Sequence, residues 1–412
     1  MSDKVKKQRR PVDPNSARYK LNQIIVRHYE EAFEAKEAGE MVGWCASNFP
    51  QEIHETLGLK VCYPENQAAA IAARGAGEKL CEIAESEGYS NDICAYARIS
   101  MAYTKIKDAP EQNMPQPDFL LCCNNICNCM IKWYENIAVE LDIPLIMIDI
   151  PFNTGYDVSK AQIEYIKAQF LEAIKQLEEI TGKKWDDEKF KEVMAISNRT
   201  SRAWLEATSY TKYTPSPLNG FDLLNHMAVA VCARGTVEAA EAFETLTEEY
   251  KKAVQEGTST YRGEEKYRIM FEGIACWPHL RTTFNGLKSR DINMVATIYA
   301  DAFGVLYDDF DGLVEAYCKV PNCINLEKAR DVRVDIVNNT KAEGLLVHTN
   351  RSCKLWSGFM YEMSRQIGEE CDIPVVSFDG DQADPRNFSE AQYDTRVQGL
   401  MEIMEANKGE RI

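Results

Sequence analysis

Short apolar runs alternate with helical patterns along most of this 412-residue chain. In its first part the runs fall at 41–47, 60–63, 118–122 and 145–150, with helical patterns between them. Strands and helices in alternation are typical of βαβ units, in which parallel strands lie side by side in one sheet. The first part of the chain is therefore predicted to fold as an α/β domain.

The alternation stops in the middle of the chain, where the pattern is helical throughout. Ser159 and Gln162 have the spacing of a capping box, and one apolar stripe follows them as far as Gly182. Further helices are predicted at about 221–233 and 236–254. This block is expected to form a helical segment between two α/β parts.

Alternation returns in the last third of the chain, so a second parallel sheet is expected there. The predicted fold class is α/β, with two Rossmann-like (flavodoxin-like) domains and a helical segment between them. The expected strands lie at 269–275, 294–299, 344–348 and 375–378. The expected divisions are 1–38 for a solvated tail and N-terminal helix, 39–158 for the first α/β domain, 159–262 for the helical segment and 263–412 for the second α/β domain.

The two α/β parts carry a similar local pattern, which suggests a pseudo-repeat. In the first, an apolar run leads to Cys127, a helix and then Asp142-Ile-Pro; in the second, an apolar run leads to Cys353, a helix and then Asp372-Ile-Pro. Each cysteine thus follows a parallel strand, at the edge where ligands bind in open α/β sheets. If the two edges face each other, Cys127 and Cys353 meet across a cleft.

The cysteine content limits the cellular setting and the chemistry. There are 14 cysteines, no apolar stretch long enough to span a bilayer and no secretory signal pattern. A reducing cytosol is therefore expected, in which thiols stay free or bind metal. Most cysteines should be small buried hydrophobic residues, including those in apolar periodic stretches. These are Cys62, Cys81, Cys232, Cys318 and Cys371.

Four cysteines crowd into a short segment: Cys122, Cys123, Cys127 and Cys129. Their spacing matches neither a zinc ribbon nor a ferredoxin, so further ligands of any metal site must come from elsewhere in the chain. Cys94, in a loop-like stretch, is a candidate. Spacing alone leaves a metal site and a structural role equally open.

Several other chemistries are excluded or weakly indicated. The formal charge of −17 disfavours nucleic acid and anionic membranes as partners. The chain lacks the P-loop, H-E-x-x-H and G-x-S-x-G motifs. His54 and His226 lie in helical patterns, which favours structural roles. Asp379, Asp381 and Asp384 are better explained by a turn after a strand than by a cation site.

Several motifs, in order, resemble the (R)-2-hydroxyacyl-CoA dehydratase family: YPENQAAA, DICAYAR, CCNNIC, RGEEKYRI, NRSCKLW and FDGDQADPR. The resemblance extends from about residue 42 to the C-terminus and is to the substrate-binding, α-type subunit. It implies an oxygen-sensitive lyase that removes water through a ketyl radical and leaves an (E)-2-enoyl-CoA. The implied substrate is (R)-3-phenyllactyl-CoA from amino-acid fermentation, with 2-hydroxyisocaproyl-CoA as the alternative.

The resemblance also implies a cofactor, partners and site residues. The cofactor is a [4Fe–4S] cluster with one iron not bound by cysteine, and its ligands would be Cys94, Cys127 and Cys353. Ser47 would hydrogen-bond the ligand on the open iron or the thioester oxygen, and Glu65 would transfer a proton. The implied partners are a second homologous subunit in a heterodimer, an ATP-dependent iron–sulfur activator and the 2-hydroxyacyl-CoA substrate.

Some alternatives stay open at this point. Cys129 departs from the family pattern and places a second thiol near Cys127. A benzoyl-CoA-reductase-type enzyme and a non-catalytic electron-relay subunit are possible, although Ser47 and Glu65 argue against a pure relay. The absence of paired C-x-x-C motifs argues against a structural zinc protein. Lys and Arg are too scattered to indicate which residues bind coenzyme A.

Overall fold

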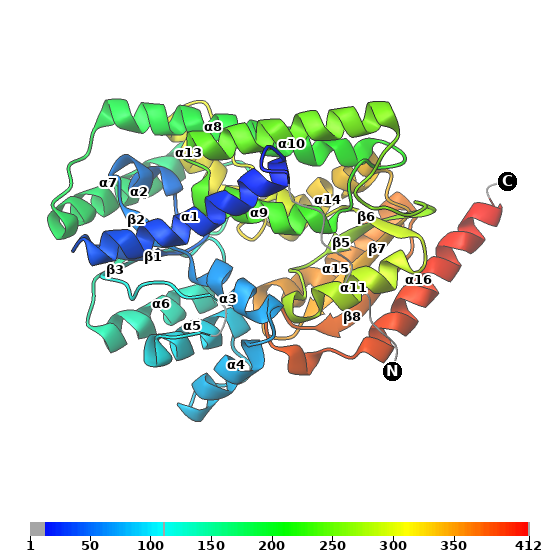
Figure 1. Cartoon of the computed structure of the whole chain (residues 1–412), viewed down its shortest axis with the longest axis horizontal. Helices are drawn as coiled ribbons and strands as arrows, with labels where there is room; N and C mark the ends of the chain where they lie inside the picture. Colours follow the sequence, from blue (N-terminus) through cyan, green and yellow to red (C-terminus); the bar gives the residue numbers. More distant parts are fainter. Residues whose placement is uncertain (1–12, 110–111, 411–412) are drawn as a thin grey trace.

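The computed structural model describes residues 13–109 and 112–410 of the chain. It contains two separate four-stranded parallel sheets with helices packed around them (Figure 1). The prediction of an α/β fold with parallel sheets is confirmed. The expected solvated tail at 1–12 lies outside the described residues.

The first sheet has the strand order β2-β1-β3-β4. The chain adds β2 on one side of β1 and then β3 and β4 on the other side, so the switch point of the strand order lies between β1 and β3. Ligands bind at such a switch point in open α/β sheets. The strands are β1 (Val42–Cys45), β2 (Lys60–Cys62), β3 (Phe119–Cys123) and β4 (Leu145–Ile148). The helices of this part are α1 (Ala17–Glu37), α2 (Gln51–Thr56), α3 (Pro64–Ala73), α4 (Gly77–Ser86), α5 (Ala95–Ile106) and α6 (Asn128–Leu141).

The second sheet has the order β6-β5-β7-β8, so its switch point lies between β5 and β7. Its strands are β5 (Tyr267–Glu272), β6 (Ile292–Ala296), β7 (Gly344–Asn350) and β8 (Val375–Gly380). Its helices are η2 (Trp277–His279), α11 (Leu280–Lys288), α12 (Ile298–Asp301), α13 (Phe310–Cys318), α14 (Leu326–Thr340), α15 (Lys354–Cys371), η3 (Pro385–Asn387) and α16 (Glu390–Glu410).

The expected strand at 294–299 was placed too far along the chain. Thr297 is the extended N-cap of α12, so the backbone leaves the sheet after Ala296 and turns into a helix. An apolar run does not distinguish the end of a buried strand from the start of a buried helix. This boundary matters, because it places Tyr299 on a helix above the sheet edge.

Long helices lie between the two sheets in the chain: α7 (Lys160–Thr181), α8 (Asp187–Ser209), α9 (Phe221–Ala233) and α10 (Val237–Glu256), with the short η1 (Tyr210–Lys212). The predicted capping box of Ser159 and Gln162 is present, and Gly182 ends α7 in a left-handed conformation. Helices α8 and α10 lie side by side, and α1 packs on α9 and α10 (Figure 1).

Buried polar side chains join the first α/β part to the helices and to the second part. Glu52 on α2 accepts hydrogen bonds from Ser197 (2.7 Å), Tyr307 (2.9 Å) and Tyr317 (3.0 Å). Arg234 pairs with the same carboxylate at 3.2 Å. Burial raises the pKa of Glu52, but the charge of Arg234 and these hydrogen bonds outweigh it, so the pKa is lowered overall.

Replacing Arg234 with methionine is expected to destabilise the protein by about 3–5 kcal/mol, because it leaves the Glu52 carboxylate buried without its cation. Denaturant unfolding followed by circular dichroism measures this loss. Arg27, whose ion pairs are exposed, is the matched control, and Arg27→Met should leave the midpoint unchanged. An unchanged midpoint in Arg234→Met would contradict the structural role of the pair.

Most cysteines predicted to be core residues are so. Cys62, Cys81, Cys232 and Cys318 are buried, whereas Cys371 at the end of α15 is only half-buried. The searched part of the chain, 13–109 and 112–410, contains no helix that is both long and apolar enough to cross a membrane.

Candidate functional site

Two adjoining cavities lie where the segments after the central strands of both sheets come together. Ser47 and Cys127 follow β1 and β3, and Ile274 and Cys353 follow β5 and β7; all four line the inner cavity, whose volume is about 110 Å³. The outer cavity has a volume of about 720 Å³, in the range of sites for small molecules and cofactors. The two share four lining residues: Ser47, Glu65, Tyr299 and Phe303.

The inner cavity brings together cysteines that are far apart in the sequence. Cys94, Cys127 and Cys353 all line it, as does Cys129. The pairing of Cys127 with Cys353 that the two strand ends suggested is therefore present in the fold. Cys122 and Cys123, by contrast, are buried within β3 and do not line the cavity.

Cys94, Cys127 and Cys353 occupy the same local position, because each is the N-cap residue of a helix. The helices are α5, α6 and α15, so three helix N-termini point at one cavity. Backbone N–H groups at a helix N-terminus favour negative charge nearby. This arrangement suits an anionic group held by thiolates.

Electrostatics of the free thiols point the same way. Burial and the neighbouring Cys353 raise the pKa of Cys127 to about 12, and burial, with the Asp381 carboxylate and Cys129, raises the pKa of Cys353 to about 12. Burial also raises the pKa of Cys94, and the nearby sulfurs of Cys129 and Cys353 add to this rise. Thiolates at this place therefore need a positively charged partner.

One cysteine sulfur has a side-chain hydrogen bond from the other α/β part. The Nε2 atom of Gln382 donates to the sulfur of Cys94 at 3.1 Å. Ser352 holds Gln382 by donating to its Oε1 atom at 3.2 Å, and Ser352 in turn accepts from the backbone N–H of Ala95 at 3.0 Å. Hydrogen bonds to sulfur ligands are one means by which proteins tune iron–sulfur clusters.

The donors at this cavity are of the type that bind iron–sulfur clusters, whose irons are held by cysteine thiolates. Within 13–109 and 112–410, no three His, Cys, Asp or Glu side chains are close enough together to hold one metal ion. In a cluster each thiolate binds a different iron, so the sulfurs stand apart around it. Three thiols around one cavity, each at a helix N-terminus, fit such a group in both donor type and charge.

Ser47 and Glu65 lie together beside the thiols, where the two cavities meet. The backbone N–H of Ser47 donates to Oε1 of Glu65 at 2.9 Å, and the hydroxyl of Tyr134 on α6 donates to Oε2 at 3.4 Å. Glu65 lies in the first turn of α3, directly after Pro64, which starts the helix. The carboxyl group is thus fixed on both oxygens.

The environment of Glu65 suits proton transfer. Burial raises its pKa, although the hydrogen bonds from Ser47 and Tyr134 partly oppose this. A carboxyl group with a raised pKa exchanges protons more readily near neutral pH than an ordinary surface glutamate. Its position on both cavities gives it access to a molecule that reaches from one to the other.

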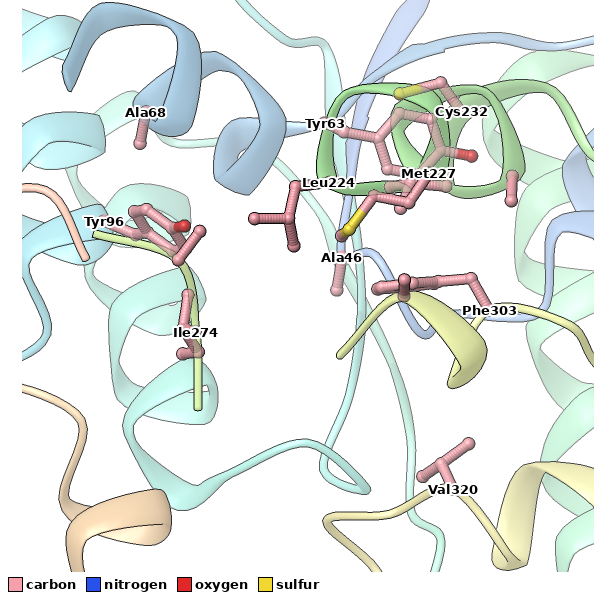
Figure 2. Packing of buried hydrophobic residues seen from close by; sticks show 14 of the residues in the cluster. Ala46, Tyr63, Ala68, Tyr96, Leu224, Met227, Cys232, Ile274, Phe303 and Val320 are labelled. Atoms are coloured by element: carbon pink, nitrogen blue, oxygen red, sulfur yellow. The ribbon is translucent and has the colours of Figure 1, made fainter. Parts of the chain in front are cut away.

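Several residues of this site had no signal in the sequence analysis. Figure 2 shows Tyr96 and Ile274 on one side, Leu224 and Met227 from helix α9, and Phe303, which follows α12. The first two line the inner cavity, Leu224 and Met227 line the outer one, and Phe303 lines both. From the sequence, single aromatic and aliphatic residues in apolar stretches are interpreted as core residues. Only the tertiary structure shows that these residues line a cavity.

The aspartates after β8 have the structural role that the sequence favoured. Asp381 accepts backbone hydrogen bonds from Ser352, Ala383 and Asp384, which shape the turn. Asp384 pairs with the buried Arg98 at 2.9 Å. The motif that contains them therefore joins the two α/β parts beside the thiol cavity.

Comparison with known proteins finds relatives along nearly the whole chain. A family model described as 2-hydroxyglutaryl-CoA dehydratase, D-component, matches residues 46–404. The chain is 62% identical to the (R)-phenyllactyl-CoA dehydratase alpha subunit of Clostridium sporogenes, over 99% of each chain. It is 51% identical to the (R)-2-hydroxyisocaproyl-CoA dehydratase alpha subunit of Clostridioides difficile, over 96% of this chain and 98% of the relative. It is 47% identical to subunit alpha of (R)-2-hydroxyglutaryl-CoA dehydratase from Acidaminococcus fermentans, over 94% of this chain and 96% of the relative.

Proposed function

The chain belongs to the 2-hydroxyglutaryl-CoA dehydratase D-component family and is a subunit of a 2-hydroxyacyl-CoA dehydratase, and from this we propose that it is the substrate-binding subunit of an enzyme that converts (R)-3-phenyllactyl-CoA into (E)-cinnamoyl-CoA. The observation that carries this is the convergence of three N-cap cysteines with Ser47 and Glu65 at one cavity. The 62% identity to a phenyllactyl-CoA dehydratase subunit supports the aromatic substrate over 2-hydroxyisocaproyl-CoA.

The proposed cofactor is a [4Fe–4S] cluster held by Cys94, Cys127 and Cys353, with one iron free of cysteine. Such a cluster would supply one-electron chemistry at the thioester carbonyl with no net redox change over the reaction. Ser47, at the junction of the cavities, is proposed to donate a hydrogen bond to the thioester oxygen or to the ligand on the open iron.

Glu65 is the proposed base for the β-proton. Its carboxylate accepts this proton as the α-hydroxyl group departs, and the proton and the hydroxide together make the water that is released. The backbone of Ser47 and the hydroxyl of Tyr134 hold the carboxyl group in place, which fixes its direction toward the substrate.

The proposed setting is a cytosolic heterodimer. All 14 cysteines are free, which suits a reducing compartment. The named relatives are alpha subunits, which supports a second, homologous subunit as partner. Because the chain has no P-loop, a separate ATP-dependent iron–sulfur activator is proposed to deliver the low-potential electron.

We further propose that the two α/β parts are a pseudo-repeat joined by the helical segment. The two sheets have equivalent strand orders. Helices α6 and α15 also end alike, since Asp142 and Asp372 both have φ of 52°. Each half then contributes one cysteine at its switch point, Cys127 from the first and Cys353 from the second.

An anaerobic assay of the heterodimer with activator and ATP tests the function. We expect (R)-3-phenyllactyl-CoA to give cinnamoyl-CoA many times per electron delivered, with 2-hydroxyisocaproyl-CoA as the poorer substrate. Consumption of electrons in proportion to product would instead indicate a reductase of the benzoyl-CoA type. Full activity of the partner subunit without this chain would indicate an electron relay or a scaffold.

Arg18 is the proposed contact for the anionic part of coenzyme A, because it lies on the outer cavity at the start of α1. Arg18→Ala is expected to raise KM by about 3- to 10-fold and leave kcat unchanged, since an exposed charge-assisted contact is modest. Steady-state kinetics at low and high salt measure this, and the difference should shrink at high salt. Arg202 on α8, exposed and away from both cavities, is the control.

A further inference from the structure

Three aromatic side chains from the two α/β parts lie on the walls of the two cavities. Trp277 lies in η2 after β5, Tyr96 lies on α5, and Tyr299 lies on α12 after β6. The indole Nε1 of Trp277 donates to the hydroxyl of Tyr96 at 2.5 Å. Tyr96 and Tyr299 both line the inner cavity.

The bond from Trp277 has a fixed direction. The indole N–H of Trp277 is a donor only, so the Tyr96 oxygen accepts. This bond joins η2 of the second α/β part to α5 of the first and so holds Tyr96 at the inner cavity, which Tyr299 also lines.

Tyr299 lies at the junction of the two cavities. It lines both the inner and the outer cavity, together with Ser47 and Glu65. A phenol O–H can donate a hydrogen bond, so Tyr299 can serve a molecule bound at this junction. Tyr299 faces the junction from the second α/β part, whereas Ser47 and Glu65 come from the first.

We propose that Tyr299 is a further catalytic residue, whose hydroxyl donates a hydrogen bond to the α-hydroxyl oxygen of the bound 2-hydroxyacyl thioester. Negative charge develops on this oxygen as its bond to carbon breaks, and a donor already held in place stabilises that charge without reorganisation. Tyr299 keeps its proton throughout. This role rests on the proposed dehydratase function and adds a donor opposite Glu65.

Binding measured without activator tests the contact, because no turnover occurs. Two ligands are compared, (R)-3-phenyllactyl-CoA and 3-phenylpropionyl-CoA, which lacks only the α-hydroxyl group. Tyr299→Phe is expected to weaken binding of the first by about 3- to 10-fold, the scale of a neutral hydrogen bond, and to leave the second unchanged. With activator, kcat should fall by about 100-fold at unchanged iron content.

Equal weakening of both ligands, or no change in either, would overturn the assignment. Tyr250→Phe is the control, since Tyr250 is another buried phenol and its hydroxyl has no partner among the described residues. Trp277→Phe keeps the Tyr299 hydroxyl but removes the hydrogen bond that holds the neighbouring Tyr96, so kcat should fall only several-fold. A loss of kcat as large as that of Tyr299→Phe would also argue against the assignment. If the wild-type heterodimer binds neither thioester, the proposed function itself is wrong.

Discussion

Replacing Cys353 with serine is expected to remove iron from the anaerobically purified protein and to lower dehydration by at least about 1000-fold, the scale of losing an essential catalytic group. Cys353 is the N-cap of α15 and lines the inner cavity with Cys94 and Cys127. Without the thiol of Cys353, only Cys94 and Cys127 of the first α/β part remain, and two cysteines are too few to hold the proposed cluster. Wild-type protein should contain about four irons per chain.

The control lies on the same helix. Cys371 ends α15, is half-buried and lines neither cavity, so Cys371→Ser should retain iron and activity. Iron, acid-labile sulfide and zinc are measured together. Stoichiometric zinc in the wild type, or iron retained in Cys353→Ser, would refute the ligand set. Cys129→Ser is informative in addition: retained iron leaves Cys127 as the ligand from this segment, whereas lost iron identifies Cys129 as a competing ligand.

Replacing Glu65 with glutamine is expected to lower kcat by about 100- to 10,000-fold, the range found for a general base, while iron content and thioester binding persist. The substitution preserves shape and removes the group that accepts the β-proton. Glu55 gives a matched control, because burial raises its pKa to about 7 and yet it lines neither cavity. Glu55→Gln should leave kcat unchanged.

The pH profile checks the same role. Glu65 acts as a carboxylate, so the rate rises with pH as the group loses its proton. Because burial raises its pKa, this limb of kcat/KM should lie above the range of an ordinary glutamate. The limb should be absent from the residual activity of Glu65→Gln. An unchanged profile in the variant would assign proton transfer to another group.

The sequence predicted the elements with strong local signals. The capping box at Ser159 and Gln162 and the left-handed Gly182 are set by interactions between residues close in the chain, so a local pattern is enough to find them. The strand ends before Cys127 and Cys353 were found for the same reason.

Cys94 was correctly placed in a loop-like stretch, but helix α5, which starts directly after it, was not predicted. The residues of this helix from Ala95 to Thr104 are all buried. A helix that is enclosed on every side has no polar face and therefore no periodic pattern to detect. Its sequence signal is lost because its surroundings, and not its own residues, decide its exposure.

What the sequence determined by itself was the α/β class, the two sheets and the cysteines that follow two strands, because periodicity and capping act over a few residues. The family resemblance had named Cys94 with Cys127 and Cys353, but only the tertiary structure brings the three thiols to one cavity and places Tyr299 on that cavity with Glu65. These groups meet through the packing of segments up to hundreds of residues apart. Such convergence depends on the shape of the whole fold, which no local pattern encodes.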